Sequence, residues 1–185
     1  MTQIEILPVL RERNSSIAFD PAKTISEDDM QALLEAARWA PSGGNGQPWR
    51  WMIARRGTPE FDGIWNVLMP GNQGWTKFAP VLMIAAAQTS YTRPDGTKQE
   101  NRTAFYDAGL ANMSLAAEAT RRGLNLRMMG GFKLDEARKL MPEGVEPICV
   151  IALGATNDGG HLPEDMRARI SAPRQRKSIS EFVIA

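Results

Sequence analysis

The chain has 185 residues and a mass of 20.4 kDa, which is the size of one ordinary domain, so we expect a single domain over residues 1–185. Hydrophobic residues make up 43% and charged residues 23%, close to the globular average, which excludes wholesale disorder. The formal net charge of +1 produces no strong field toward nucleic acid or anionic lipid, so neither partner is expected.

In chain order, the first predicted element is a helix that begins after Ser26 and runs to about Trp39. Ser26 is a good N-cap, three carboxylates fill the first turn, and apolar residues then recur every three or four positions. The elements that follow are a loop over 41–46, a strand over 49–54, a helix over 59–68 and a loop over 70–74.

The rest of the chain continues to alternate between strands and helices. A long helix over 103–122 should end at Gly123, and its apolar face is predicted to contain Leu110, Met113, Ala117 and Thr120. The other elements are strands over 81–87, 124–128 and 147–153, a polar segment with a turn at 94–96, a helix over 134–141 and an aperiodic basic tail over 161–177. This alternation indicates an α+β or α/β architecture around one central sheet.

Two residue types are scarce enough to limit the chemistry. Cys149 is the single cysteine and fits a core strand, so a disulfide within the chain and a Cys-rich zinc site are excluded. His161 is the single histidine and lies in a polar loop, where we expect it at the surface. We therefore expect no metal site and chemistry that depends on neither cysteine nor histidine.

The start of the chain and the lengths of its apolar runs bear on location. Residues 1–10 contain Glu5 and no basic segment ahead of an apolar run, which is not typical of a secretory signal. The longest apolar stretches, 81–87 and 148–153, are far shorter than the ~20 residues that span a bilayer. The sequence therefore predicts a soluble, cytoplasmic protein without membrane association.

Several enzyme motifs are absent from the sequence. No G-x-G-x-x-G follows a strand and no G-x-x-x-x-G-K-[ST] occurs, so a Rossmann dinucleotide site and a P-loop are excluded. No G-x-S-x-G nucleophile turn occurs either. Gly-rich and amide-rich loops remain, together with two separated basic segments, and these suit the binding of a preformed anionic cofactor.

Four segments carry this pattern in a fixed order. They are Arg13-Asn14-Ser15 with Phe19, the run Ala40–Trp49 that contains P-S-x-x-N-x-Q-P-W, the turn Gly130-Gly131-Phe132, and Arg174-Gln175-Arg176. Their order, over nearly the whole chain, resembles the FMN-dependent nitroreductase family. The resemblance implies an α+β fold with a central antiparallel or mixed sheet flanked by helices. It also implies an intertwined homodimer with FMN at the subunit interface.

The resemblance assigns the residues that would contact FMN. Arg13, Asn14 and Ser15 would reach the phosphate or the ribityl chain, as a guanidinium and a hydroxyl are suited to do. Arg174 and Arg176 would complete the phosphate site from the C-terminal segment.

Two further segments would contact the isoalloxazine ring. The loop with Pro41, Ser42, Gly43, Asn45 and Gln47 would reach it from the partner subunit, and its side chains can match the donors and acceptors of the ring edge. The residues Met129, Gly130 and Gly131 would place a backbone amide against N5, the atom that accepts hydride, while Asn72 would meet the pyrimidine edge. No side chain is assigned a catalytic role, because the flavin itself carries the hydride.

One position departs from the family pattern. Relatives usually carry a basic residue where this chain has Ile17, near flavin N1 and O2, where negative charge collects on reduction. An apolar side chain cannot stabilise that charge, so the sequence predicts a lowered reduction potential that Ile17→Lys should raise. Lys77 could compensate, and Trp75 could line a substrate pocket.

The leading hypothesis is an NAD(P)H-dependent FMN oxidoreductase. NADH or NADPH would pass hydride to the flavin, and a nitroaromatic, quinone or related small molecule would take the electrons. Two alternatives remain open. One is a flavin-binding storage or sensor protein of the same fold without efficient turnover, and the other is a protein that has kept the fold but lost FMN.

Overall fold

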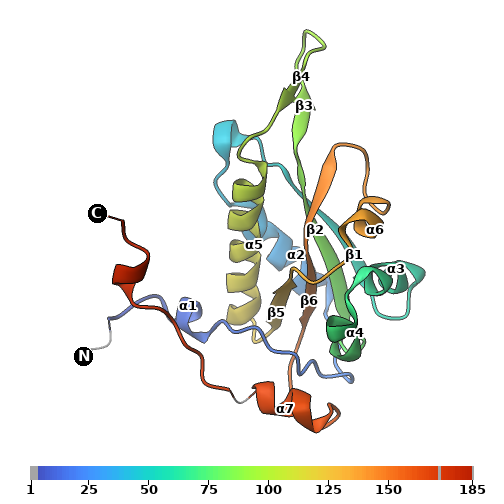
Figure 1. The fold of residues 1–185 in the computed structure, drawn as a ribbon, viewed down its shortest axis with the longest axis vertical. Coiled ribbons are helices and arrows are strands. Elements are labelled where there is room, and N and C mark those ends of the chain that lie inside the picture. The colour runs from blue at the N-terminus through green and yellow to red at the C-terminus, as the bar shows by residue number, and fades with distance from the viewer. Residues whose placement is uncertain (1–3, 171, 185) are drawn as a thin grey trace.

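A four-stranded antiparallel sheet forms the centre of the computed structural model, which describes residues 4–170 and 172–184 (Figure 1). The strand order is β1-β2-β6-β5, so β5 pairs only with β6 and is an edge strand. The bounds are β1 (Trp49–Arg55), β2 (Val81–Gln88), β5 (Asn125–Met129) and β6 (Val145–Gly154). A separate hairpin of β3 (Ser90–Thr92) and β4 (Lys98–Glu100) projects from one end of the sheet.

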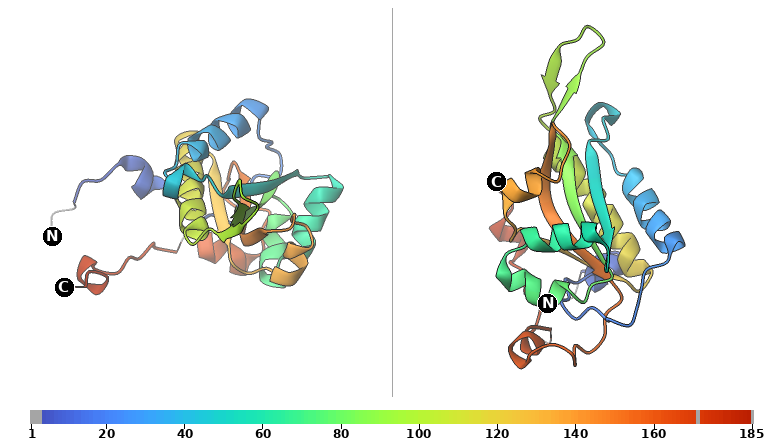
Figure 2. Two further views of the ribbon diagram at one scale, coloured as in Figure 1. Left: turned by 90° about the horizontal axis from the view of Figure 1, so that it is seen from above. Right: turned by 90° about the vertical axis from the view of Figure 1, so that its right-hand side faces the viewer.

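Helices cover both faces of the sheet, as the perpendicular views show (Figure 2). On one face lie α2 (Glu27–Arg38) and α5 (Ala104–Arg121), and on the other lie α3 (Pro59–Val67), α4 (Pro70–Thr76) and α6 (Leu134–Arg138). Alternate side chains of β2 belong to the two cores: Met83 and Ala85 pack toward α2 and α5, whereas Leu82 and Ile84 pack on the other face. A helix-covered antiparallel sheet is an α+β architecture.

The helix boundaries follow from the local chemistry that the sequence suggests. The Ser26 hydroxyl accepts a hydrogen bond from the Asp29 amide at 3.0 Å and begins α2. The Thr58 hydroxyl accepts from the Phe61 amide at 3.3 Å and begins α3. Gly123 adopts a φ of 71° just after α5, a conformation that favours glycine.

Three predictions about local structure are wrong. Residues 70–74 are not a loop but begin α4, because Pro70 suits a first helical turn and Trp75, fully buried, anchors the helix in the core. The tail expected to be aperiodic contains α7 (Glu164–Ile170). His161 is half-buried and packs edge-on against Phe78, with its Nε2 buried and without a described partner.

The buried face of α5 also differs from the prediction. The residues that pack on the sheet are Ala104, Ala108, Ala111, Leu115 and Ala119. The predicted residues Leu110, Met113, Ala117 and Thr120 lie to one side and are only half-buried. Small alanines face the sheet because they allow the helix to approach it closely. An apolar strip of α5 therefore remains open to solvent.

The two ends of the chain project from the same side of the molecule (Figures 1 and 2). The N-terminal segment contains α1 (Pro8–Glu12), and the C-terminal segment contains the short helix η2 (Ile179–Glu181). The Arg174 guanidinium joins the two segments, donating to the Arg13 carbonyl at 2.8 Å and to the Arg11 carbonyl at 2.7 Å. Several apolar side chains on these segments are exposed, namely Ile4, Leu7, Leu10, Ile179, Phe182, Val183 and Ile184.

Candidate functional site

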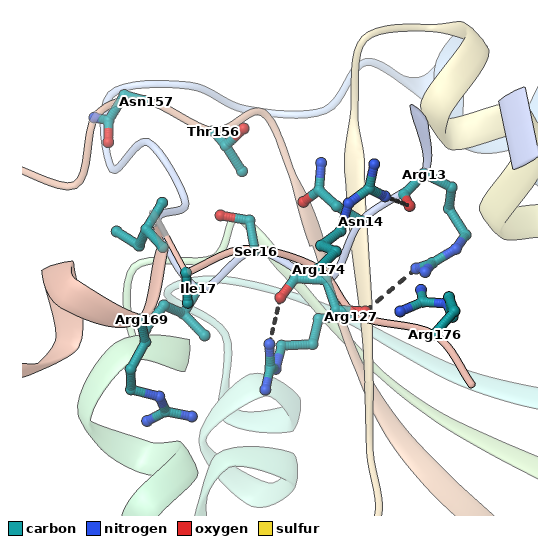
Figure 3. A pocket seen from close by; sticks show the side chains of 13 residues that line it. Arg13, Asn14, Ser16, Ile17, Arg127, Thr156, Asn157, Arg169, Arg174 and Arg176 are labelled. Carbon is teal, nitrogen blue, oxygen red and sulfur yellow. Dashed lines mark hydrogen bonds between the residues drawn. The ribbon is translucent and has the colours of Figure 1, made fainter. Parts of the chain in front are cut away.

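A cavity of about 710 Å³ lies where both terminal segments meet β5 (Figure 3). Its volume lies within the usual range of small-molecule sites. The N-terminal segment, β5, the stretch after β6 and the C-terminal segment all contribute to it. The lining residues are Arg13, Asn14, Ser15, Ser16, Ile17, Arg127, Thr156, Asn157, Arg169, Ile170, Ala172, Arg174 and Arg176.

Backbone pairing holds the N-terminal segment in place beneath the cavity. Phe19 forms an antiparallel bridge with Thr156, and the Asn157 amide donates to the Ala18 carbonyl at 3.0 Å. Both cavity walls are thus formed by segments that are far apart in the sequence.

Asn125, at the start of β5, fixes the other side of this segment. Its Oδ1 accepts from the Ser16 amide at 3.1 Å, and its Nδ2 donates to Asn14 Oδ1 at 2.8 Å. The Asn125 side chain is 7% exposed and is satisfied on both polar atoms, as a buried amide requires. The segment that carries Arg13 to Ile17 is therefore held rigidly along the edge strand.

The cavity carries strong positive charge. Five arginines line it, namely Arg13, Arg127, Arg169, Arg174 and Arg176. Within residues 4–170 and 172–184, no carboxylate lines the cavity and none of these arginines forms an ion pair. Burial, and then the neighbouring guanidinium groups of Arg176 and Arg174, lower the pKa of Arg13. Guanidinium groups without counter-charges suit a multiply charged anion such as a phosphate.

All of the predicted residues from the two basic segments lie in this cavity. Arg13 Nη1 donates to the Ser15 hydroxyl at 3.2 Å, so these two side chains point toward one another. Arg176 lies beside Arg13 (Figure 3), as their electrostatic interaction also requires. Arg174 differs, because its guanidinium already binds the carbonyls of Arg11 and Arg13.

A second group of predicted residues lies at the far end of β5, outside the described lining of the cavity. Asn72 Nδ2 donates to the Gly131 carbonyl at 3.0 Å, which ties α4 to the turn after β5. A Cβ at position 131 would lie 2.8 Å from Asn72 Nδ2, so the contact requires glycine. The amides of Gly130 and Gly131 donate to no described residue. Met129 is buried in the core.

The loop with Pro41, Ser42, Gly43, Asn45 and Gln47 lies at the opposite end of α5 from the cavity (Figure 1). Its polar groups largely satisfy one another: the Ser42 hydroxyl accepts from the Gln47 amide at 3.0 Å, and Gln47 Nε2 donates to Asn45 Oδ1 at 3.1 Å. Asn45 and Gln47 have φ values of 54° and 44°, which are strained for residues other than glycine.

Asp107 attaches this loop to the first turns of α5. Its Oδ2 accepts from the Gly43 amide at 3.1 Å and from the Thr103 hydroxyl at 2.9 Å. The Asp107 side chain is 3% exposed, so a carboxylate is buried there to hold the loop. A Cβ at position 43 would lie 2.9 Å from the Thr103 hydroxyl oxygen, which explains the glycine.

Sequence reasoning missed Arg127, Arg169, Thr156, Asn157 and the supporting Asp107. One signal was present, because Arg127 lies inside a predicted strand between the apolar residues Leu126 and Met128. Trp75 was expected to line a pocket, but it is fully buried and stacks on Phe19 with ring centroids 6.0 Å apart. Lys77 is exposed, with its Nζ over the Phe78 ring, and does not line the cavity.

Among residues 4–170 and 172–184, no group of three or more His, Cys, Asp or Glu side chains could hold a metal ion. No described helix combines the length and the apolar character needed to cross a bilayer.

Several known proteins are similar to this chain. An oxidoreductase whose crystal structure contains FMN is 31% identical, with a TM-score of 0.92 over 100% of this chain and 93% of that one. YdgI of Bacillus subtilis (strain 168), provisionally named an NAD(P)H nitroreductase, is 24% identical over 85% of this chain and 91% of its own length. An uncharacterised 15.4 kDa protein of Mycolicibacterium smegmatis is 30% identical over 71% of this chain and 92% of its own.

The family model described as "Nitroreductase family" matches residues 10–69 and 56–155, a span that includes the Arg13–Ser15 segment, the loop before β1 and the turn after β5. The match covers most of the chain and agrees with the α+β fold of the structural neighbour. The chain therefore belongs to the nitroreductase family.

Proposed function

We propose that this protein is an NAD(P)H-dependent FMN oxidoreductase that acts as a homodimer. The observation that carries the proposal is the cavity beside β5 with five arginines that no described carboxylate neutralises. A phosphate monoester with adjoining hydroxyl groups fits this donor set, and FMN has such a phosphate and ribityl chain. The FMN of the solved neighbour and the NAD(P)H in the name of the Bacillus relative support the same assignment.

Arg13, Ser15 and Arg176 would bind the phosphate. Arg13 and Ser15 already contact one another, and Arg176 has its guanidinium on the same side of the cavity. Arg174 would contribute by holding the two terminal segments together, and Asn14 by fixing the segment on Asn125. The preformed arrangement reduces the side-chain ordering that binding would otherwise require.

The isoalloxazine ring would extend along the edge of β5 toward Gly130 and Gly131. The unpaired amides of this turn would donate to the ring, and Asn72 would meet its pyrimidine edge. When bound, FMN would supply the redox chemistry by accepting hydride from NADH or NADPH at N5 and reducing a nitroaromatic, quinone or related conjugated molecule. This chain's residues would position the ring and leave one face open to both substrates.

Two features of the single chain support the proposed homodimer. The loop Pro41–Gln47 and the cavity lie at opposite ends of α5, about 27 Å apart for a helix of 18 residues, so one copy cannot bring them together. A two-fold axis that pairs α5 with its partner in antiparallel orientation would place the loop of one subunit at the cavity of the other.

The exposed apolar surface lies where such a partner would bind. Phe105 and Tyr106 on α5 are 53% and 71% exposed, and Met113 continues their strip. The apolar side chains of both terminal segments project on the same side, free of the parent domain. An obligate dimer buries exposed apolar side chains of this kind. We also place the protein in the cytoplasm, where NADH and NADPH are available.

Absorption spectroscopy and stopped-flow mixing with NADH or NADPH test the proposed function directly. The purified protein should be yellow, and the flavin absorbance should bleach promptly when reduced nicotinamide is added. Subsequent addition of a quinone should restore the absorbance. A yellow protein that does not bleach would support the storage or sensor alternative, and a protein that fails to bind FMN would overturn the proposal.

A further inference from the structure

Arg127 is a half-buried arginine on the edge strand β5. It lies between Asn125 and Met129. Its guanidinium donates to the Ser15 carbonyl and lies over the Trp75 ring, with Cζ 5.3 Å from the ring centroid (Figure 3). The carbonyl and the indole face therefore fix the position of the cation.

The charge of Arg127 is not balanced by the described protein. Burial, and then the charge of the Arg169 guanidinium, lower the pKa of Arg127. Ile17, 3% exposed, lies between the two arginines in the view of Figure 3, so this part of the cavity is apolar as well as cationic. A partly desolvated cation without a counter-charge interacts strongly with any negative charge that enters its surroundings.

Arg127 lies farther along β5 than Asn125, and it contacts Ser15 through the backbone carbonyl, not through the hydroxyl assigned to the phosphate. Asn125 holds Asn14 and Ser16, beside Arg13 and Ser15. From Arg127 to Gly130 the strand advances three residues, or about 10 Å. Arg127 thus lies between the phosphate residues and the amides expected at N5.

We propose that Arg127 faces the pyrimidine edge of the bound flavin, at N1 and the C2 carbonyl, and raises its reduction potential. This inference rests on the proposed function. Two-electron reduction of FMN places negative charge on that edge. Of the two cations that line the cavity near Ile17, Arg127 is the one fixed on the sheet by the Ser15 carbonyl and the Trp75 ring, whereas Arg169 lies on α7. Lys77 cannot stabilise that charge, because it is exposed over Phe78 and outside the cavity lining. Arg127 acts as a positioning and electrostatic residue, and no proton leaves it.

The test compares the potential of bound FMN in the wild type and in Arg127→Gln by spectroelectrochemical titration. Removing the cation should weaken the binding of reduced FMN about tenfold more than that of oxidised FMN, which lowers the potential by about 30 mV for a two-electron couple. Arg127→Lys should recover part of the shift, because it keeps the charge without the planar guanidinium. Ile17→Lys in the Arg127→Gln background should also raise the potential.

Arg176→Gln is the matched control, since it removes a cation from the phosphate end of the same cavity. This substitution should weaken the binding of oxidised and reduced FMN to a similar extent and leave the reduction potential nearly unchanged. If Arg127→Gln behaves in the same way, Arg127 is a phosphate-binding residue and the inference is wrong. Arg127→Met, which keeps the aliphatic stem on Trp75, replaces the glutamine variant should that variant fail to fold. Failure of the wild type to bind FMN would overturn the proposed function instead.

Discussion

The cavity beside β5 and the loop before β1 were both predicted to contact FMN, yet they differ in their state in the single chain. The cavity holds cations without counter-charges, whereas the loop satisfies its polar groups internally and through Asp107. The cavity thus offers unneutralised cations to an anion, whereas the loop offers a fixed shape to a neighbouring surface. In the proposed dimer, each copy would contribute the cavity to one site and the loop to the other, and most of the ligand affinity would come from the cavity.

The largest loss of FMN affinity should come from disrupting the proposed dimer, which separates the loop of one subunit from the cavity of the other. Met113→Arg places a charge in the middle of the exposed strip of α5, which the proposed dimer would bury. We expect a monomer by light scattering and FMN binding weakened by more than about a hundredfold, because half of the contacts would be lost.

Trp39→Arg is the control for this experiment, since Trp39 is an exposed apolar residue just after α2 and outside α5. It should leave both the mass and the FMN affinity unchanged. A Met113→Arg protein that remains dimeric with full FMN occupancy would contradict the proposed arrangement.

Removal of a single cation from the cavity should have the next largest effect. Arg13→Gln removes a charge-assisted contact to phosphate, typically about 1.5–3 kcal/mol, so the Kd for FMN should rise roughly 10- to 150-fold. Fluorescence titration of the apoprotein measures it.

Arg11→Gln serves as the comparison, because the Arg11 side chain donates to the Ile4 carbonyl and does not line the cavity. Its Kd should remain that of the wild type. If Arg11→Gln and Arg13→Gln lose FMN affinity equally, then the net charge of the protein, rather than the geometry of the cavity, governs FMN binding.

Loss of the Asp107 carboxylate, which holds the loop before β1, should reduce the stability of the fold more than the affinity for FMN. Asp107→Ala leaves the Gly43 amide and the Thr103 hydroxyl without their acceptor, which should cost about 1–3 kcal/mol of unfolding free energy in urea titrations. Asp107→Asn retains an acceptor oxygen and should lose less. Unchanged stability in Asp107→Ala would show that the buried carboxylate does not hold the loop.

The smallest expected effect is on stability and concerns Glu118 on α5, the helix whose two ends lie near the loop and the cavity. Hydrogen bonds from Arg121, and then from Arg122, lower the pKa of Glu118 on α5 from its ordinary 4.5 to about 2. Because the folded-state pKa is depressed, this stabilisation is present above the unfolded pKa and is lost as the pH falls from about 4.5 toward 2.

Glu118→Gln should therefore lower the unfolding free energy slightly at pH 7, by less than about 1 kcal/mol, because the Arg121 side chain is 64% exposed. The difference from the wild type should shrink between pH 4.5 and pH 2, and the FMN affinity should not change. A difference that persists at pH 2 would assign the effect to packing.

Much of the fold could be predicted because local chemistry decides it. The cap at Ser26, Gly123 after α5 and the apolar run of β2 each act within a few residues, and the structure confirms all three elements. The helix α4 was missed because its sequence, rich in glycine and asparagine, favours a loop. Burial of Trp75 overrides that preference, and no local pattern reveals such burial.

The site was predictable to the extent that its residues form short motifs. Arg13, Ser15 and Arg176 come from recognisable segments, and the structure brings them together. Arg127 and Asp107 make contacts with residues that are distant in the sequence. Arg127 donates to the Ser15 carbonyl, 112 residues away, and Asp107 accepts from the Gly43 amide, 64 residues away. Their partners become apparent only when the sheet order and the path of the terminal segments are known.

The bond between Arg174 and the carbonyls of Arg11 and Arg13 also has a consequence for biosynthesis. Arg174 and Arg176 follow β6 in the chain, so all four strands of the sheet are synthesised before this wall of the cavity exists. Under the proposed function, a nascent chain would bind FMN firmly only after these arginines have emerged from the ribosome. A chain truncated before residue 174 should therefore form the sheet and bind FMN weakly.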